Sequence, residues 1–286
     1  MTHEFGVEMK PPGIRRELRS LGVRALWAGI AQTSADAGQS QRQEAMKAAA
    51  DNAAAVGGGP ALDKTVESAQ ARLMQALRAH GSPERAEWEK AYQKSRWDHC
   101  GVSLPGMDGA ITETLGGLSQ DEALELCRRL WREPVWDLKI VAARTLARKS
   151  VEPDAKVWAF VTERLIDLDG WAVADNLADV ASRCLVADPG RLDDVEAWIE
   201  SPHLWTRRAA LVFTLPWAKE KRSPERMLGW AARLAEDRQW FIQKAVGWWL
   251  RELSKRDPKS VRRFLKENGQ KLTGVAKREA AKYLKA

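Results

Sequence analysis

The stretch WTRRAALV, residues 205–212, belongs to a motif that recurs along the chain. Related stretches are WDLKIVAA at 136–143 and FIQKAVGW at 241–248, each with an aromatic residue first and a basic residue fourth. A further copy, WAVADNLA at 171–178, keeps the aromatic residue but has Ala174 in the fourth position. Successive aromatics lie 35, 34 and 36 residues apart and are Trp136, Trp171, Trp205 and Phe241. A fixed period of this length indicates a repeat protein.

Prolines mark a second helix in each repeat. They are spaced by 36, 35 and 34 residues and are Pro153, Pro189, Pro224 and Pro258. Asp188, Ser223 and Asp257 precede three of them and are suited to N-cap a helix, with proline at the first helical position. One amphipathic helix pair cannot bury its own apolar stripe, so the pairs must stack. The sequence therefore predicts an all-α, HEAT-like α-solenoid of stacked helix pairs whose first helices line a concave basic groove.

A glycine-rich stretch divides the chain in two. VGGGP, residues 56–60, ends a segment that is poor in bulky apolar residues, and we interpret it as a linker. We expect residues 1–62 to form a partly helical N-terminal extension and residues 63–286 to form the repeat domain. Within the extension, GIRRELRSLGVRALWAGI at 13–30 is interpreted either as a basic helix that flanks the first repeat or as a basic arm that touches the ligand.

Positive charge is concentrated toward the C-terminus. The 286 residues carry a net charge of +7, but residues 201–286 contain 21 Lys and Arg against 8 Asp and Glu, which is a net of +13. Residues 1–200 therefore carry a net charge of −6. This polarisation favours a polyanionic partner, and a solvated basic surface without a partner is the alternative. The chain also has 14 tryptophans, and we expect most of them in the core.

The composition disfavours several classes of protein and of site. No run of 18 apolar residues occurs, so no transmembrane helix is expected, and residues 1–20 lack the apolar segment of a signal peptide. Cys100, Cys127 and Cys184 lie far apart and are expected to be reduced and structural. The four histidines are scattered without the spacing of a zinc site, so no metal is expected.

Asp175 departs from the pattern of the repeat. Residues 0, +3, +4 and +7 of each first helix share one face, because successive residues turn by about 100°. At +4 the other copies carry Ile140, Ala209 and Ala245, and burying an unpaired carboxylate among such residues is costly. Trp248 is a second departure, at +7 of the last copy. We expect one groove to be lined by Trp171, Asp175, Arg208, Lys244 and Trp248.

Each of these residues also has a structural interpretation. Asp175 could pair with Arg208 as a strut between repeats, and Trp248 could fill a gap in the core. The recurring aromatic and basic positions could form a packing ladder common to such solenoids. Their coincidence with the strongly basic part of the chain favours a functional interpretation.

Three stretches resemble the AlkD-type DNA alkylation repair glycosylases, HEAT-like repeat enzymes that release cationic N3- and N7-alkylated purines from DNA. They are GWAVADNLADV at 170–180, HLWTRRAALVFTL at 203–215 and FIQKAVGWWLRELSK at 241–255. The similarity runs from about Ala86 to Leu284, and the N-terminal extension has no recognised counterpart. In this family a Trp-x-x-x-Asp motif, an Arg before Ala-Ala and a distal Gly-Trp form the active cleft. Those motifs correspond here to Trp171, Asp175, Arg208 and Trp248.

The chain also departs from the pattern of this family. Gly106, Met107 and Asp108 follow GVSLP, where family members carry polar and basic residues that contact DNA. Pro216 and then Trp217 stand after LVFTL, where a basic residue is usual in the family. These departures predict fewer or rearranged contacts with the DNA backbone.

The resemblance implies a monofunctional glycosylase that hydrolyses the N-glycosidic bond of cationic N3- or N7-alkylpurines in double-stranded DNA. Asp175 is expected to stabilise the oxocarbenium-like sugar and to position water, while Trp171 and Trp248 stack on the lesion or its deoxyribose. We expect a cytoplasmic bacterial monomer that acts at the nucleoid and needs no cofactor. The alternative is a non-catalytic HEAT-repeat protein that binds damaged DNA or serves as a scaffold. The expected DNA contacts come from Arg207, Arg208, Lys244 and Arg251.

Overall fold

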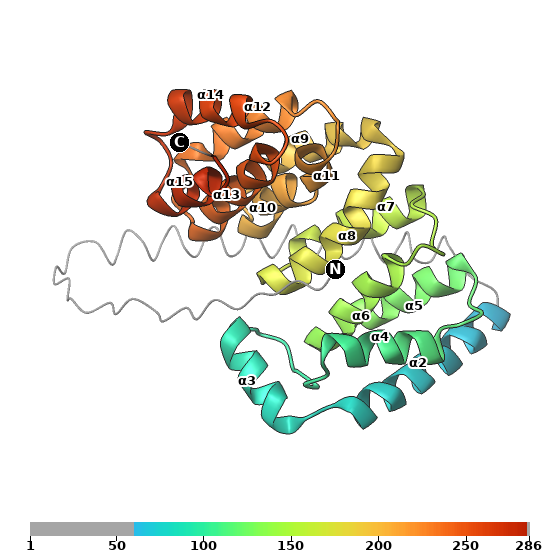
Figure 1. The fold of residues 1–286 in the computed structure, drawn as a ribbon. Helices are drawn as coiled ribbons and strands as arrows, with labels where there is room; N and C mark the ends of the chain where they lie inside the picture. The colour runs from blue at the N-terminus through green and yellow to red at the C-terminus, as the bar shows by residue number, and fades with distance from the viewer. Residues whose placement is uncertain (1–59, 285–286) are drawn as a thin grey trace, which may run out of the picture. The chain divides into compact units, whose positions relative to one another are not determined.

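The computed structural model describes residues 60–284, which form a series of helices joined by turns and short loops (Figure 1). An isolated bridge between Asp98 and Val135 is the only β-type pairing in this part of the chain. The all-α prediction is therefore confirmed. The predicted linker and basic segment of the N-terminal extension lie outside the described residues, apart from Pro60 at the start of the first described helix.

The helices form two rows. The first row contains α4 (Leu104–Thr114), α6 (Trp136–Leu146), α8 (Trp171–Ala187), α10 (Leu204–Val212), α13 (Trp240–Ser254) and α15 (Gly274–Ala281). The second row contains α2 (Pro60–His80), α5 (Gln120–Arg132), α7 (Ala155–Arg164), α9 (Leu192–Trp198), α12 (Glu225–Arg233) and α14 (Pro258–Asn268). The remaining elements are α3 (Pro83–Gln93), α11 (Leu215–Lys219) and the 3-10 turns η1 (Leu165–Asp167), η2 (Pro189–Arg191) and η3 (Leu234–Glu236).

Contacts within and between the rows give the predicted stack. Each helix of the first row packs against the next helix of that row, and α6, α8, α10 and α13 each also pack against a helix of the second row. Figure 1 shows this stack following a curve from α2 to α15. These contacts confirm the HEAT-like α-solenoid that the period of the sequence predicts.

Most helix starts agree with the sequence analysis. Helices α6, α8, α10 and α13 begin at, or one residue before, the recurring aromatic residue. The Asp188 side chain accepts a hydrogen bond from the Gly190 N–H, and that of Asp257 accepts one from Ser260. The N-cap predicted at Ser223 is wrong. Helix α12 begins one residue later, because the Pro224 carbonyl accepts its first helical hydrogen bond, from Leu228.

Tryptophans pack between successive repeats. Trp158 of α7 stacks on Trp198 of α9 with ring centroids 5.7 Å apart, and its Nε1 donates to Asp194 at 2.8 Å. Trp230 of α12 likewise donates from Nε1 to Glu196 of α9 at 2.8 Å. Each ring is thus buried while its polar edge has a partner. Within residues 60–284 the expectation of core tryptophans is confirmed for Trp131, Trp136, Trp158, Trp198, Trp205, Trp217, Trp230 and Trp249.

Arginines also tie each repeat to the one before it. Arg183 at the end of α8 donates to the carbonyls of Arg148 at 2.7 Å and Val151 at 2.6 Å. Arg256 after α13 donates to the carbonyls of Trp217 at 2.6 Å and Arg222 at 2.8 Å. Carbonyls near a helix C-terminus lack helical partners, and a cationic donor satisfies them. Part of the positive charge therefore serves the fold.

Pro216 interrupts the first-row helix of its repeat. Helix α10 ends at Val212, and α11 begins three residues later with Pro216 in its first turn. The Thr214 hydroxyl donates to the Ala210 carbonyl at 2.8 Å across this break. Trp217 is then turned into the core, where it is 5% exposed. A residue that departs from the family pattern thus has a packing role.

Candidate active site and nucleic-acid interface

Asp175 lies one turn into α8 and faces Arg208 of α10. Arg208 Nη1 donates to Asp175 Oδ1 at 2.6 Å, and Nη2 donates to Oδ2 at 3.4 Å. The Arg208 side chain is 5% exposed, whereas that of Asp175 is 26% exposed. The carboxylate is therefore oriented from inside the protein and stays accessible to a ligand. The strut between repeats that the sequence left open is present.

Arg208 is enclosed on its other sides. Its guanidinium carbon lies 5.8 Å from the centroid of the Trp205 ring. Its Nε is buried and has no hydrogen-bond partner among the described residues. The first role of Arg208 in this geometry is thus to hold Asp175. A contact between Arg208 and a DNA phosphate stays a prediction.

Aromatic rings extend from Trp171 onto α3. The partly buried Trp171 meets Tyr92 edge-on, with ring centroids 6.4 Å apart. Tyr92 stacks on Trp88 at 5.2 Å with nearly parallel rings, and these two side chains are 49% and 61% exposed. Trp88 and Tyr92 were not among the site residues predicted from the sequence. Their spacing of four in a charged helix, WEKAY, is the signal that places both rings on one helix face.

Three predicted site residues lie on α13. Trp248 is partly buried and packs against the hydrophobic core. Lys244 and Arg251 flank it on the same helix and both reach Glu279 of α15. Lys244 Nζ lies 2.5 Å from Glu279 Oε1, and Arg251 Nη1 donates to Oε2. The structure thus joins Lys244 to Arg251 in one ion-pair cluster and Asp175 to Arg208 in another.

The Glu279 carboxylate is partly enclosed in this cluster. Burial acts to raise the pKa of Glu279, but Lys244 and Arg251 outweigh it and hold the pKa below its usual range. Glu279 is therefore ionised at neutral pH and balances one of the two positive charges. Glu279 was not predicted from the sequence, because α15 lies beyond the last copy of the recurring motif.

The fourth position of the repeat has a different environment in each copy. Lys139 of α6 is 2% exposed and donates from Nζ to the carbonyls of Trp131 at 2.6 Å and Glu133 at 2.8 Å. Burial lowers its pKa to about 8. Arg208 is also enclosed, whereas the Lys244 side chain is 36% exposed. Of these three basic positions, Lys244 is the one open to a polyanion.

Arg207 is engaged within the protein. Its Nε donates to Asp237 Oδ2 at 3.0 Å, and its Nη1 donates to the Ser201 carbonyl at 2.8 Å. The side chain is 17% exposed. These contacts favour a structural role, and the DNA contact predicted for Arg207 stays a prediction.

Two departures from the family pattern also have internal partners. Met107 of α4 is fully buried, and Asp108 Oδ1 accepts from Arg144 Nε at 2.6 Å. Arg144 reaches onward from Nη1 to Asn176 Oδ1 at 3.2 Å, beside Asp175. Asp108 thus links α4 to α6 and, through Arg144, to the helix that carries Asp175.

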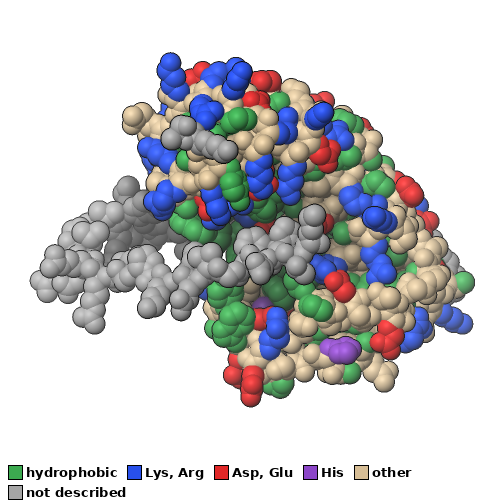
Figure 2. Space-filling model, in the orientation of Figure 1, with side chains coloured by type: hydrophobic (Ala, Val, Ile, Leu, Met, Phe, Trp, Pro, Cys, Tyr) green, Lys and Arg blue, Asp and Glu red, His purple; other side chains and the backbone are tan. Residues whose placement is uncertain are grey.

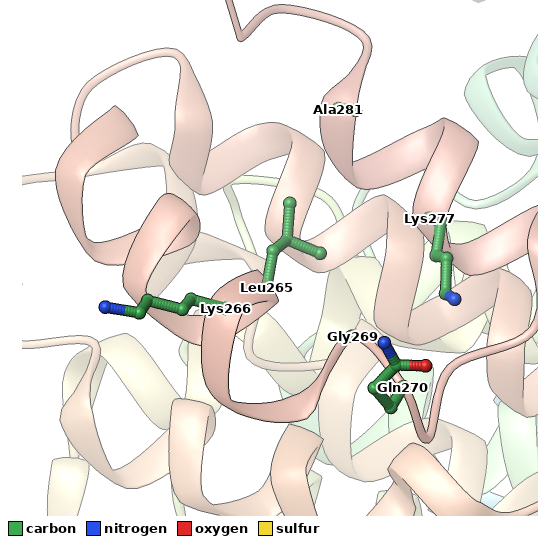
Figure 3. Close-up of a pocket in the computed structure, with 6 residues that line it drawn as sticks. All are labelled: Leu265, Lys266, Gly269, Gln270, Lys277 and Ala281. Atoms are coloured by element: carbon green, nitrogen blue, oxygen red, sulfur yellow. The ribbon is translucent and has the colours of Figure 1, made fainter.

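No group of three or more His, Cys, Asp or Glu side chains within residues 60–284 is placed to hold a metal ion. A shallow cavity of about 310 Å³ lies between α14 and α15 (Figure 3). In Figure 3 the side chains of Lys266 and Lys277 at this cavity point in different directions. Because Asp175 and Arg208 do not line the cavity, it is not part of the candidate site.

Surface charge agrees with the distribution along the sequence. Figure 2 shows Lys and Arg side chains gathered over the C-terminal helices. No helix within residues 60–284 is both long and apolar enough to span a bilayer.

Fold and site together define a HEAT-like helical-repeat protein with a buried arginine beneath an accessible aspartate and a basic C-terminal part. Residues 73–284 match the model of a family described as DNA alkylation repair enzyme, and the chain belongs to this family. This membership supports a role in DNA repair and an interaction with DNA. None of the curated proteins compared with the chain matches it.

Solved structures with the same fold come from two bacteria. A predicted DNA alkylation repair enzyme from Enterococcus faecalis is 25% identical, with a TM-score of 0.61 over 72% of this chain and 97% of that one. AlkD2 from Streptococcus mutans is 20% identical, with a TM-score of 0.53 over 64% of this chain and 91% of that one. The match to AlkD2 concerns the fold alone.

Proposed function

We propose that the protein is a monofunctional DNA glycosylase that hydrolyses the N-glycosidic bond of cationic N3- or N7-alkylpurines in double-stranded DNA. The observation that carries the proposal is the placement of Asp175. It lies on the first-row helix α8, is held by the buried Arg208, and stays 26% exposed. A carboxylate that is both fixed and accessible suits the stabilisation of positive charge on a bound ligand.

The proposed reaction depends on a negative charge close to the sugar and not on a general acid that protonates the leaving base. An N3- or N7-alkylated purine is already cationic, so it leaves without being protonated by the enzyme. Breaking the glycosidic bond builds positive charge on the sugar, as in the oxocarbenium-like transition state of glycoside hydrolysis. The carboxylate of Asp175 stabilises that charge from a position fixed before the reaction begins.

Arg208 orients the two oxygens of Asp175 unequally. Oδ1 is held at 2.6 Å, whereas Oδ2 lies 3.4 Å from its donor. Oδ2 therefore keeps more of its capacity to accept a hydrogen bond from the attacking water. In this proposal Arg208 acts through Asp175, and its own reach toward a phosphate is secondary.

The aromatic side chains supply contact area for the damaged nucleotide. Trp171 is adjacent to Asp175 on α8, and Tyr92 and Trp88 continue from its edge on α3. An aromatic face attracts a cation by roughly 0.5–2 kcal/mol, depending on how far the site is desolvated. We propose that Trp171 and Trp248 stack on the lesion or its sugar.

The proposed partner is double-stranded DNA with alkylated bases, bound by a cytoplasmic monomer that uses no cofactor. Lys244 and Arg251 are the proposed backbone contacts, because Lys244 is the most exposed of the four predicted cations, at 36%, and Arg251 shares its ion-pair partner on the same helix. Arg207 and Arg208 are more fully engaged inside the protein and contribute less directly.

The test is release of free 7-methylguanine from methylated duplex DNA by the purified protein under single-turnover conditions. Asp175→Asn keeps the size of the side chain and removes its charge. We expect excision to slow by roughly 10- to 1000-fold, the scale of a few kcal/mol of lost electrostatic stabilisation. The variant should also melt earlier, because Arg208 loses its partner while it stays buried. Excision is therefore measured well below the melting temperature of the variant.

Asp194→Asn is the matched control. This carboxylate accepts from Trp158 in the second row, so its loss weakens packing and leaves the candidate site untouched. A second candidate function, binding of damaged DNA without catalysis, is favoured by the close pairing of Asp175 with Arg208. If Asp175→Asn melts earlier but excises at the wild-type rate, Asp175 is only a strut. If the wild-type protein binds methylated DNA and releases no base, the non-catalytic function holds.

A further inference from the structure

Glu279 lies between two basic residues that the proposed function assigns to the DNA backbone. Lys244 and Arg251 are seven residues apart on α13, so their side chains emerge from one face two turns apart. Glu279 enters from α15 and gives one oxygen to each of them, Oε1 to Lys244 and Oε2 to Arg251. A single carboxylate thus bridges two cations across two turns of helix.

The backbone, and not a flexible side chain, brings Glu279 to this place. A Cβ atom added at Gly247 would lie 2.7 Å from the Glu279 Cβ and 2.9 Å from the Ala276 carbonyl oxygen. Only a glycine permits α13 and α15 to approach so closely. Gly247 lies between Lys244 and Arg251 along α13, so this close contact of the two helices falls between the two cations.

The cluster is accessible enough for its partners to exchange. The side chains of Lys244, Arg251 and Glu279 are 36%, 19% and 19% exposed. Arg251 Nε also lies 3.4 Å from Glu252 Oε1, and Glu252 accepts from Lys255 at 2.7 Å. The cations thus already pair with carboxylates in the absence of DNA, although they lie at the surface.

We propose that the Glu279 carboxylate occupies the place of a DNA phosphate between Lys244 and Arg251, and that DNA must displace it in order to bind there. The proposal rests on the proposed function, because it takes α13 to be part of the DNA-binding surface. A carboxylate and a phosphodiester each offer two charged or partly charged oxygens to a pair of cationic donors. Glu279 therefore weakens binding at α13 until other contacts have docked the duplex.

The experiment measures the affinity of the full-length protein for an unmodified DNA duplex over a series of salt concentrations. Glu279→Gln keeps the shape of the side chain and removes its charge. We expect affinity to rise several-fold at low salt. The plot of log affinity against log salt should also steepen, by about 0.9 for each additional phosphate contact.

Glu236→Gln is the control for net charge. Glu236 pairs with Lys271 at 3.0 Å in the same basic part of the chain, and both side chains are largely exposed. It changes the net charge by the same amount as Glu279→Gln without freeing Lys244 or Arg251. The gain in affinity specific to Glu279 is therefore the difference between the two variants.

A double-mutant cycle makes the test independent of folding defects. Lys244→Gln should cost little affinity in the wild-type background and clearly more in the Glu279→Gln background, where Lys244 is free. If Glu279→Gln alone does not fold, Lys244→Gln is compared with the double variant Lys244→Gln/Glu279→Gln. In the double variant Arg251 lacks the Glu279 carboxylate, so the double variant should bind DNA more tightly than Lys244→Gln.

The outcomes separate this inference from the proposed function. If the wild-type protein binds DNA and Glu279→Gln binds no more tightly than Glu236→Gln, the role of Glu279 is overturned and the proposed function stands. Weaker binding by Glu279→Gln also overturns it, because Glu279 would then position the cations for DNA. If no variant binds DNA, both proposals fall.

Discussion

Lys139, Arg208 and Lys244 occupy the same position in three repeats, yet each has a different partner. Lys139 is enclosed by two backbone carbonyls and Arg208 is held by Asp175, whereas the more exposed Lys244 pairs with Glu279. A basic residue thus recurs at this position, but its partner differs with the neighbouring helix. At the scale of single residues, the environment and not the repeat decides which cation can meet DNA.

Buried histidines make the stability of the fold depend on pH. The side chain of His99 is fully buried and stacks on Trp136 with centroids 4.8 Å apart, and burial lowers its pKa. Burial also lowers the pKa of His203. Below the ordinary histidine pKa of about 6.5, the unfolded chain therefore binds protons that the folded chain does not. The free energy of unfolding is complete above that pH and falls as the pH decreases through it.

Urea unfolding between about pH 7.5 and 5.5 measures this loss. In a plot of the free energy of unfolding against pH, each histidine contributes a slope of at most about 1.4 kcal/mol per pH unit. His99→Gln should flatten the dependence. His80→Gln is the control for replacing a histidine, because His80 is exposed. Equal slopes for the wild-type protein and His99→Gln would show that the burial of His99 does not cause the loss of stability at low pH.

The sequence indicated some site residues and could not indicate others. Asp175 was visible because it breaks a pattern of small and aliphatic residues, and Trp171 because it recurs. The partner of Asp175 stayed open, since pairing with Arg208 depends on the rotation of two helices from different repeats. Trp88, Tyr92 and Glu279 lie outside the recurring motif, so the period of the sequence carries no information about them. Their roles follow only from contacts between helices.

At the scale of helices, prolines and aromatics located most boundaries. Proline sets the start of α14 because it is tolerated in a first helical turn, with Asp257 as its N-cap. The same residue type misled the prediction at Ser223, where Pro224 itself takes the N-cap position. The break between α10 and α11 was equally hidden, although Pro216 was noted as unusual. A proline shows that a helix boundary is near without fixing its exact residue.

The packing of α13 on α15 depends on Gly247. We expect Gly247→Ala to lower the free energy of unfolding by about 1–3 kcal/mol, the usual cost of overpacking, because its Cβ meets the backbone of Ala276. Chemical denaturation measures this change. Gly229→Ala on α12 is the control, because a Cβ there would have no atom within 4 Å and alanine favours a helix. A Gly247→Ala protein as stable as Gly229→Ala would show that α15 shifts freely.

At the scale of the whole molecule, the net charge of residues 201–286 overstates the charge available to a partner. Their excess is +13, but Arg256 satisfies backbone carbonyls, and Arg208 pairs with Asp175, which lies outside this range. A cation that already has an internal partner releases fewer counterions from DNA than a free one. The number of phosphate contacts should therefore be smaller than the excess charge.

We expect the affinity for duplex DNA to fall with salt, with a slope of about 0.9 for each phosphate contact in a plot of log affinity against log salt. Fluorescence anisotropy with a labelled duplex measures this slope. Lys156→Gln is the control, because Lys156 lies on α7 in the second row and pairs with Asp121. It should leave the slope unchanged. Affinity that is independent of salt would exclude the basic part of the chain as the DNA-binding surface.

The arginine and tryptophan contacts between repeats have a consequence for how the chain folds. Trp158 reaches Asp194 and Trp230 reaches Glu196, 36 and 34 residues away, and Arg183 reaches back 32 residues to Val151. Each of these bonds couples a repeat to its nearest neighbour. Such a chain has a low contact order and behaves as a one-dimensional array, in which order can begin at one repeat and spread to the next. The terminal repeats, with a neighbour on one side only, should open first, while the repeats around Asp175 and Arg208 are held from both sides.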